Sequence, residues 1–137
     1  IGYNLQIKHQ HARPVIARLD NRSRMTIMRH NRFIKAENAS NEVAARPNVL
    51  VGHFPIDGPG STDTYAIYAN LFFQNPHEAL FQGEGNIALY SNVFFNSHPN
   101  GFPAIAIQPH NDIPRKVRVF FNTVVHPSRG IRVLRKK

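Results

Sequence analysis

The sequence predicts an all-β fold in which short strands stack in parallel to form a coil. The apolar runs are short, rich in Val, Ile, Phe and Tyr, and bounded by Gly, Pro and Asn. No stretch keeps a helical spacing of apolar residues over three turns. An asparagine also recurs at one fixed place in alternate apolar runs, which is typical of a repeat. The alternative all-β architecture, a β-sandwich with asparagine-rich turns, does not require that recurrence.

The first type of strand carries the recurring asparagine. Residues 28–33, 67–72, 89–94 and 119–124 share the pattern apolar-x-x-Asn-x-apolar, with steps of 39, 22 and 30 residues from one asparagine to the next. At one corner of a coil, such side chains can bond to those above and below, and asparagine tolerates left-handed backbone angles. We therefore expect an inward ladder of Asn31, Asn70, Asn92 and Asn122. A core column is expected beside it, formed by Phe33, Phe72, Phe94 and Val124.

A second type of strand alternates with the first, over residues 4–8, 48–52, 79–82, 104–108 and 130–134. The nine strands predict about five rungs, with equivalent strands about 4.8 Å apart along the coil. Residues 35–46 and 54–63 interrupt the repeat and are expected to be loop insertions, which often carry binding residues. No amphipathic capping helix is visible, so we expect a fragment of a longer chain, or ends covered by an additional chain or domain.

The units at residues 67–73, 89–95 and 119–125, each followed by an apolar strand, resemble the right-handed parallel β-helix repeat family, which includes many pectate-lyase-like proteins. The resemblance covers residues 25–134. It implies a single right-handed parallel β-helix domain over residues 1–137 and an extracellular or periplasmic location. The resemblance also implies that a polysaccharide lyase with this fold would use Lys or Arg as base, as is common in the family, sometimes with calcium. The resemblance is more specific for fold than for function, because one fold hosts many sites.

Composition narrows the class of partner. The chain has 137 residues, with 17 Lys and Arg against 8 Asp and Glu, and a formal charge of +9. This excess is compatible with an anionic partner but does not by itself identify one. Cysteine is absent, which excludes disulfides and thiolate metal sites. No apolar run is long enough to span a membrane, and no signal peptide is visible.

Candidate site residues gather at the edge that follows the second-type strands. A lyase acting on uronates needs a cation for the carboxylate, a base for the adjacent carbon proton and an acid for the leaving oxygen. We predict Lys8 and His53, on adjacent rungs, as the catalytic pair, and place His110 about 10 Å beyond His53 along the axis. The predicted substrate-binding residues are His9, Arg13, Arg46, Gln82, Glu84, Gln108 and His110.

Other chemistries are less well supported by the sequence. A glycosidase needs two carboxylates at a set separation, and the eight acids form no Asp-Asp pair. His9 and His11 lack a third zinc ligand, so no metal or cofactor is predicted beyond the calcium that the resemblance allows. The cations are spread along the chain, which disfavours nucleic acid. Two functions stay open: binding, with or without β-elimination, of an acidic polysaccharide, and a non-catalytic structural or adhesive segment with a basic partner-binding surface.

Overall fold

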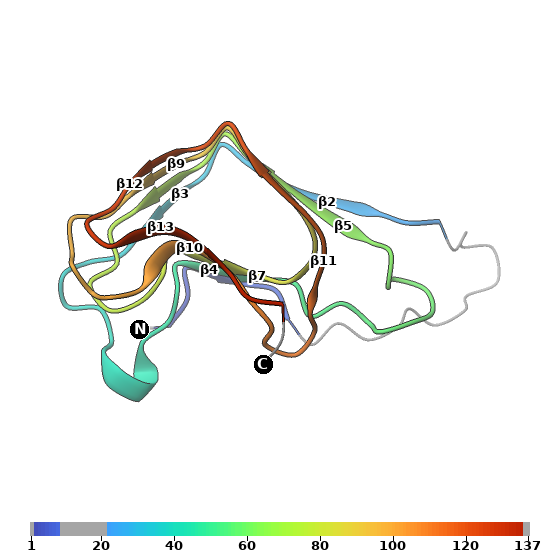
Figure 1. The fold of residues 1–137 in the computed structure, drawn as a ribbon, viewed down its shortest axis with the longest axis horizontal. Coiled ribbons are helices and arrows are strands. Elements are labelled where there is room, and N and C mark those ends of the chain that lie inside the picture. Colours follow the sequence, from blue (N-terminus) through green and yellow to red (C-terminus); the bar gives the residue numbers. More distant parts are fainter. Residues whose placement is uncertain (1, 9–21, 136–137) are drawn as a thin grey trace.

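The protein is described by a computed structural model that covers residues 2–8 and 22–135. Its strands form three all-parallel sheets that surround one core (Figure 1). Sheet A has five strands: β1 (Leu5–Gln6), β4 (Val49–Val51), β7 (Phe81–Gly83), β10 (Pro103–Ile107) and β13 (Arg129–Val133). Sheet B has four: β2 (Met25–Arg29), β5 (Thr64–Tyr68), β8 (Gly85–Tyr90) and β11 (Pro114–Phe120). Sheet C also has four: β3 (Arg32–Ile34), β6 (Leu71–Phe73), β9 (Val93–Phe95) and β12 (Thr123–Val125).

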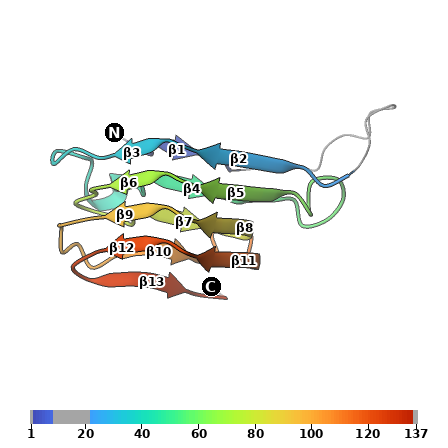
Figure 2. The ribbon, with the colours of Figure 1, turned by 90° about the horizontal axis from the view of Figure 1, so that it is seen from above.

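After β1 the chain adds one strand to sheet B, one to sheet C and one to sheet A in each turn of the coil. Each strand pairs with its equivalent in the next turn (Figure 2). The predicted all-β class with parallel strands is confirmed: the architecture is a β-helix-like solenoid. One 3-10 turn, η1 (Glu42–Ala44), lies in the insertion at residues 35–46. None of the helical segments in the described ranges is long and apolar enough to cross a membrane.

The prediction of nine strands was wrong, because each first-type segment is two strands in two different sheets. The chain bends between β2 and β3, and again between β5 and β6, β8 and β9, and β11 and β12. The positive φ of the bend belongs to the residue before the asparagine: His30, Ala69, Ser91 or Phe121, at 52–56°. The asparagines were expected to tolerate that backbone angle themselves. Instead they use their side chains for hydrogen bonds.

Those hydrogen bonds join the corners of successive turns. The Asn92 amide nitrogen donates to Asn122 Oδ1 at 3.0 Å, and Asn92 Oδ1 accepts from the side-chain and backbone N–H groups of Asn70 at the same distance. Asn31 donates to Asn70 Oδ1 in the same way. Each inner amide also donates to backbone carbonyls, as Asn92 does to Ile67 and Tyr90. A buried polar corner is thereby kept hydrogen-bonded.

Stacked aromatic rings fill the core beside this corner. The ring centroids of Phe33 and Phe72 are 5.1 Å apart, and those of Phe72 and Phe94 are 4.4 Å apart with nearly parallel planes. Parallel pairing in register places Val124 next to Phe94. Sheet A closes the core with Val49, Phe81 and Ile105, all fully buried. Strand alternation then sends the intervening side chains of sheet A outward, where the candidate site lies.

Candidate functional site

The outer face of sheet A carries amide and cationic side chains in rows along the coil. Gln6, Gln82 and Arg132 occupy equivalent positions of three strands, in register across the sheet. Leu50 and Ala106 lie between them and are only 1% exposed. The three polar side chains are half-buried. Polar side chains therefore occupy this row in β1, β7 and β13, and almost fully covered apolar side chains occupy it in β4 and β10.

A second row lies two residues further along the strands and contains Lys8 and Gln108. Backbone hydrogen bonds continue the sheet here, from Ile7 N–H to the Leu50 carbonyl and from Gln108 N–H to the Gly83 carbonyl. The two rows are connected, because Arg132 Nη2 donates to Gln108 Oε1 at 2.6 Å. Lys8 and Gln108 are both half-buried. The two rows together form the outer face of sheet A.

Charged groups flank this face at the end where its strands begin. Glu78 lies near three cations, Arg132, Arg46 and Lys35, and its Oε1 accepts from the Ala79 N–H at 2.9 Å. Burial raises the pKa of Glu78, and that hydrogen bond and those cations only partly oppose the rise. The Arg46 guanidinium carbon is 6.0 Å from the centre of the Tyr3 ring. A single carboxylate thus lies among several cations.

Lys35 anchors the insertion that carries Arg46. Its ammonium group donates to the Gly2 carbonyl at 2.7 Å and to the Arg46 carbonyl at 2.9 Å, and the residue is 8% exposed. Burial lowers the pKa of Lys35, while Glu78 opposes that shift. These contacts hold the 35–46 insertion beside the outer face of sheet A. Sequence patterns alone gave Lys35 no role.

A buried His–Glu pair lies at the opposite end of the same face. His53 Nε2 is 3.0 Å from Glu84 Oε1, and both side chains are about 1% exposed. Glu84 also accepts from the backbone N–H groups of His110 and Asn111. His53 Nδ1 lies 3.0 Å from the Asn111 side-chain nitrogen. The pair therefore fixes the loop that follows β10.

Gly52 is required for this arrangement. It has a φ of +126°, and a Cβ placed on it would lie 2.6 Å from both Glu84 Cγ and the Glu84 carbonyl oxygen. Only glycine combines that backbone angle with so close an approach. The backbone of β4 can therefore pass directly over the Glu84 side chain.

The predicted site residues fall into two groups. Lys8, Gln82 and Gln108 lie on the outer face of sheet A and are half-exposed; Arg46 lies at its flank. His53 and Glu84 are buried, at 2% and 0% exposure. Lys8 aligns with Gly52 rather than with His53, because Gln6 pairs with Leu50 and the Ile7 N–H continues that register by donating to the Leu50 carbonyl. The predictions for His9 and Arg13 lie outside the described residues.

The predicted spacing of His110 was wrong. The sequence placed it about 10 Å beyond His53 along the axis. Instead the two imidazole rings have centroids 4.9 Å apart, because the loop after β10 folds back over Glu84. His110 is exposed and lies on the covering loop. A prediction that counts rungs cannot include a loop that returns toward an earlier turn.

Five residues of the site were missed: Tyr3, Gln6, Lys35, Glu78 and Arg132. Gln6 and Arg132 could have been found by carrying the strand alternation from Gln82 to its equivalents in the first and last strands of sheet A. Within residues 2–8 and 22–135, no group of three or more histidine and acidic side chains is arranged to hold a metal ion. No protein-family model, no curated protein and no solved structure matches this chain.

Proposed function

We propose that this chain binds an acidic polysaccharide along the outer face of sheet A. The observation that carries the proposal is the pair of rows on this face, with Gln6, Gln82 and Arg132 in one and Lys8 and Gln108 in the other. Amide groups both donate to and accept from hydroxyl groups, and cations complement carboxylates. Polar groups recur along the coil at intervals, in β1, β7 and β13 in the first row and directly after β1 and β10 in the second, which suits a linear polymer with repeated hydroxyls and charges.

The fold part of the proposal is a right-handed parallel β-helix of about five rungs, of the pectate-lyase-like kind. Five strands in sheet A and the amide contacts among Asn31, Asn70, Asn92 and Asn122 support it. Right-handed connection between parallel strands is the strong general preference. An extracellular or periplasmic location, where such polymers occur, belongs to the same proposal.

Cleavage by β-elimination is a separate step of the proposal. Among the predicted catalytic residues, Lys8 is half-exposed and is the base that this face offers. Arg132 lies on β13, at the opposite edge of sheet A from Lys8, so it can bind the carboxylate of a distant sugar unit but not that of the unit from which Lys8 would take a proton. His53 is 2% exposed and engaged by Glu84 and Asn111, so its assigned role is to position the covering loop. The burial of His53 favours the alternative function, a non-catalytic segment with a basic partner-binding surface.

Titration calorimetry with polygalacturonate, alginate and a glycosaminoglycan tests binding. Arg132→Gln removes a charge-assisted group, so we expect about a tenfold weaker affinity for the preferred polymer. The matched control is Arg118→Gln, because Arg118 lies on the outer side of sheet B. Equal affinities for wild type and Arg132→Gln would contradict the proposed face.

Absorbance of unsaturated uronate products tests cleavage. Cleavage by this face predicts that the wild type releases such products and that Lys8→Ala stops the release while leaving the affinity within a few-fold. Binding without any product would establish the non-catalytic function. Full product release by Lys8→Ala would remove Lys8 from the reaction.

A further inference from the structure

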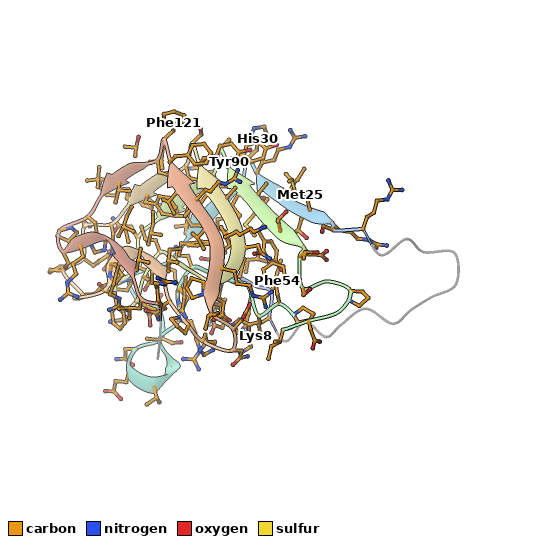
Figure 3. All side chains as sticks on the ribbon, turned by 45° about the vertical axis from the view of Figure 1, so that its right-hand side comes forward. Lys8, Met25, His30, Phe54, Tyr90 and Phe121 are labelled. Atoms are coloured by element: carbon orange, nitrogen blue, oxygen red, sulfur yellow. The ribbon has the colours of Figure 1, made fainter. Side chains whose placement is uncertain are left out.

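Sheets B and C meet in a convex ridge on the side of the molecule away from sheet A (Figure 1). Phe121, Tyr90 and His30 are labelled on this ridge in Figure 3. Phe121 is 85% exposed, which is unusual for a side chain of its size. The proposed polysaccharide face does not include this surface, and the Phe121 ring packs edge-on against Phe120, with centroids 5.5 Å apart, rather than into the core.

Outward alternation makes the flanks of the ridge apolar. On sheet B the outward residues Met25 and Ile27 are 63% and 55% exposed. On sheet C the outward residues Ile34, Val93 and Val125 are between 43% and 49% exposed. Large exposed apolar patches on folded proteins mark interaction sites. The ridge and both flanks are therefore a candidate contact surface, called the ridge face below.

The charge on the ridge face has a single sign. None of the strands of sheets B and C, all of which lie in the described part of the chain, contains Asp or Glu. Exposed cations are interspersed among the apolar residues: Arg29, Arg32, Lys116 and Arg118. Long cationic side chains can keep their charge at a polar boundary while their stems cover apolar surface. The ridge face is thus complementary to a partner surface that has anionic groups on the outside and an apolar layer beneath them.

The aromatic residues of the ridge are stacked on one another. The ring centroids of Tyr68 and Tyr90 are 4.9 Å apart with planes at 11°, and those of Tyr90 and Phe120 are 4.9 Å apart at 6°. Stacked rings cover each other's faces and leave edges outward. Nucleobases need free ring faces, so this stack is a poor platform for single-stranded nucleic acid. A second copy of the chain would bring like charges together.

We propose that the ridge face binds the surface of an anionic phospholipid bilayer, with Phe121 inserted at the headgroup boundary and Arg29, Arg32 and Arg118 against the phosphates. Aromatic side chains favour this boundary, and amphipathic basic surfaces bind it without spanning the membrane. Such binding would leave the outer face of sheet A free, because the two faces lie on opposite sides of the coil (Figure 1). The inference does not depend on the polysaccharide proposal.

Co-sedimentation with vesicles tests the inference. The protein should partition onto vesicles of phosphatidylcholine mixed with phosphatidylglycerol, more weakly onto pure phosphatidylcholine, and less as salt is raised. Phe121→Asn should reduce partitioning at least about tenfold. Asn is among the residues that best accept the positive φ of 53° at this position, so the fold is expected to survive, as circular dichroism can verify.

Matched controls separate the ridge face from general stickiness and charge. Val43→Asn changes a residue that is 92% exposed on η1, away from the ridge, and should leave partitioning unchanged. Arg118→Gln should weaken binding to the anionic vesicles about fivefold, whereas Arg135→Gln should not. Partitioning of Phe121→Asn equal to the wild type would overturn the inference. So would a ridge-dependent dimer without vesicles, or binding of single-stranded DNA in place of vesicles.

Discussion

Asn92 makes several hydrogen bonds that no apolar side chain of similar size can replace. It is 1% exposed, donates to two carbonyls and to Asn122, and accepts twice from Asn70. Asn92→Leu would leave several buried groups unpaired, each at a cost of about 1–3 kcal/mol. We expect the free energy of unfolding to fall by at least about 3 kcal/mol in urea titrations. Exposed Asn38→Leu is the control, and equal losses would show that the corner contributes little.

Gly52 allows a test of close packing against the buried carboxylate. In Gly52→Ala the new methyl group would meet Glu84 at 2.6 Å, in addition to the strain of the positive φ. We expect a loss of about 2–4 kcal/mol in the free energy of unfolding. Gly101→Ala is the matched control, because Gly101 has a φ of +79° and open space around it. That variant should lose only about 1–2 kcal/mol. Similar losses in both would contradict the packing argument.

At the scale of elements, Glu84 connects β7 to the loop after β10. In Glu84→Gln one oxygen becomes an N–H donor facing backbone donors, so the loop loses a charged acceptor. We expect hydrogen exchange at the amides of His110 and Asn111 to accelerate about tenfold or more. Glu37→Gln is the control, since the Glu37 side chain is 82% exposed where it pairs with His98. Unchanged exchange at these amides would mean that other contacts hold the loop.

Glu78, between β6 and β7, makes stability depend on pH in a defined direction. Burial raises the pKa of Glu78 above 4.5, so the folded protein holds this proton more tightly than the unfolded chain. The resulting stabilisation is fully present below pH 4.5 and is lost as pH rises through the raised pKa. Relative to Glu78→Gln, the wild type should therefore gain stability as pH is lowered from neutral toward 4.5 in urea titrations. A difference that is constant with pH would contradict the assignment.

The strands could be predicted from the sequence because their signal is local. Alternation and flanking turn residues predicted strands at residues 48–52 and 104–108, and the bounds of β4 (Val49–Val51) and β10 (Pro103–Ile107) differ from these by one residue at each end. The bend inside each first-type segment was missed, because Phe121 and Ala69 carry no sequence mark of a positive φ.

The site was only partly predictable for a related reason. Alternation places Gln82, in β7, and Glu84, directly after it, on the same side of sheet A, yet Gln82 is half-exposed and Glu84 is buried beneath the loop after β10. Whether a loop returns over an earlier turn depends on contacts between distant residues, such as His53 with Asn111. Periodicity describes neither those contacts nor the burial of Lys35.

At the scale of the whole molecule, the coil separates two surfaces of different chemistry. The outer face of sheet A combines amides and cations with Glu78, whereas the ridge face combines cations with aromatic and aliphatic groups and has no carboxylate in its strands. Parallel stacking in register brings the side chains of each surface together, because equivalent positions of successive turns lie on the same face. A polysaccharide and a membrane surface could then be bound at the same time.

The most direct test of the central claim is chemical-shift mapping by NMR while an oligomer of the preferred acidic polysaccharide is added. We expect the chemical shifts of the Gln82, Gln108 and Arg132 side chains to change during the titration, and those of Phe121 and Tyr90 to remain unchanged. Shifts centred on sheets B and C, or no shifts at any polymer concentration, would contradict the assignment of the outer face of sheet A as the binding surface.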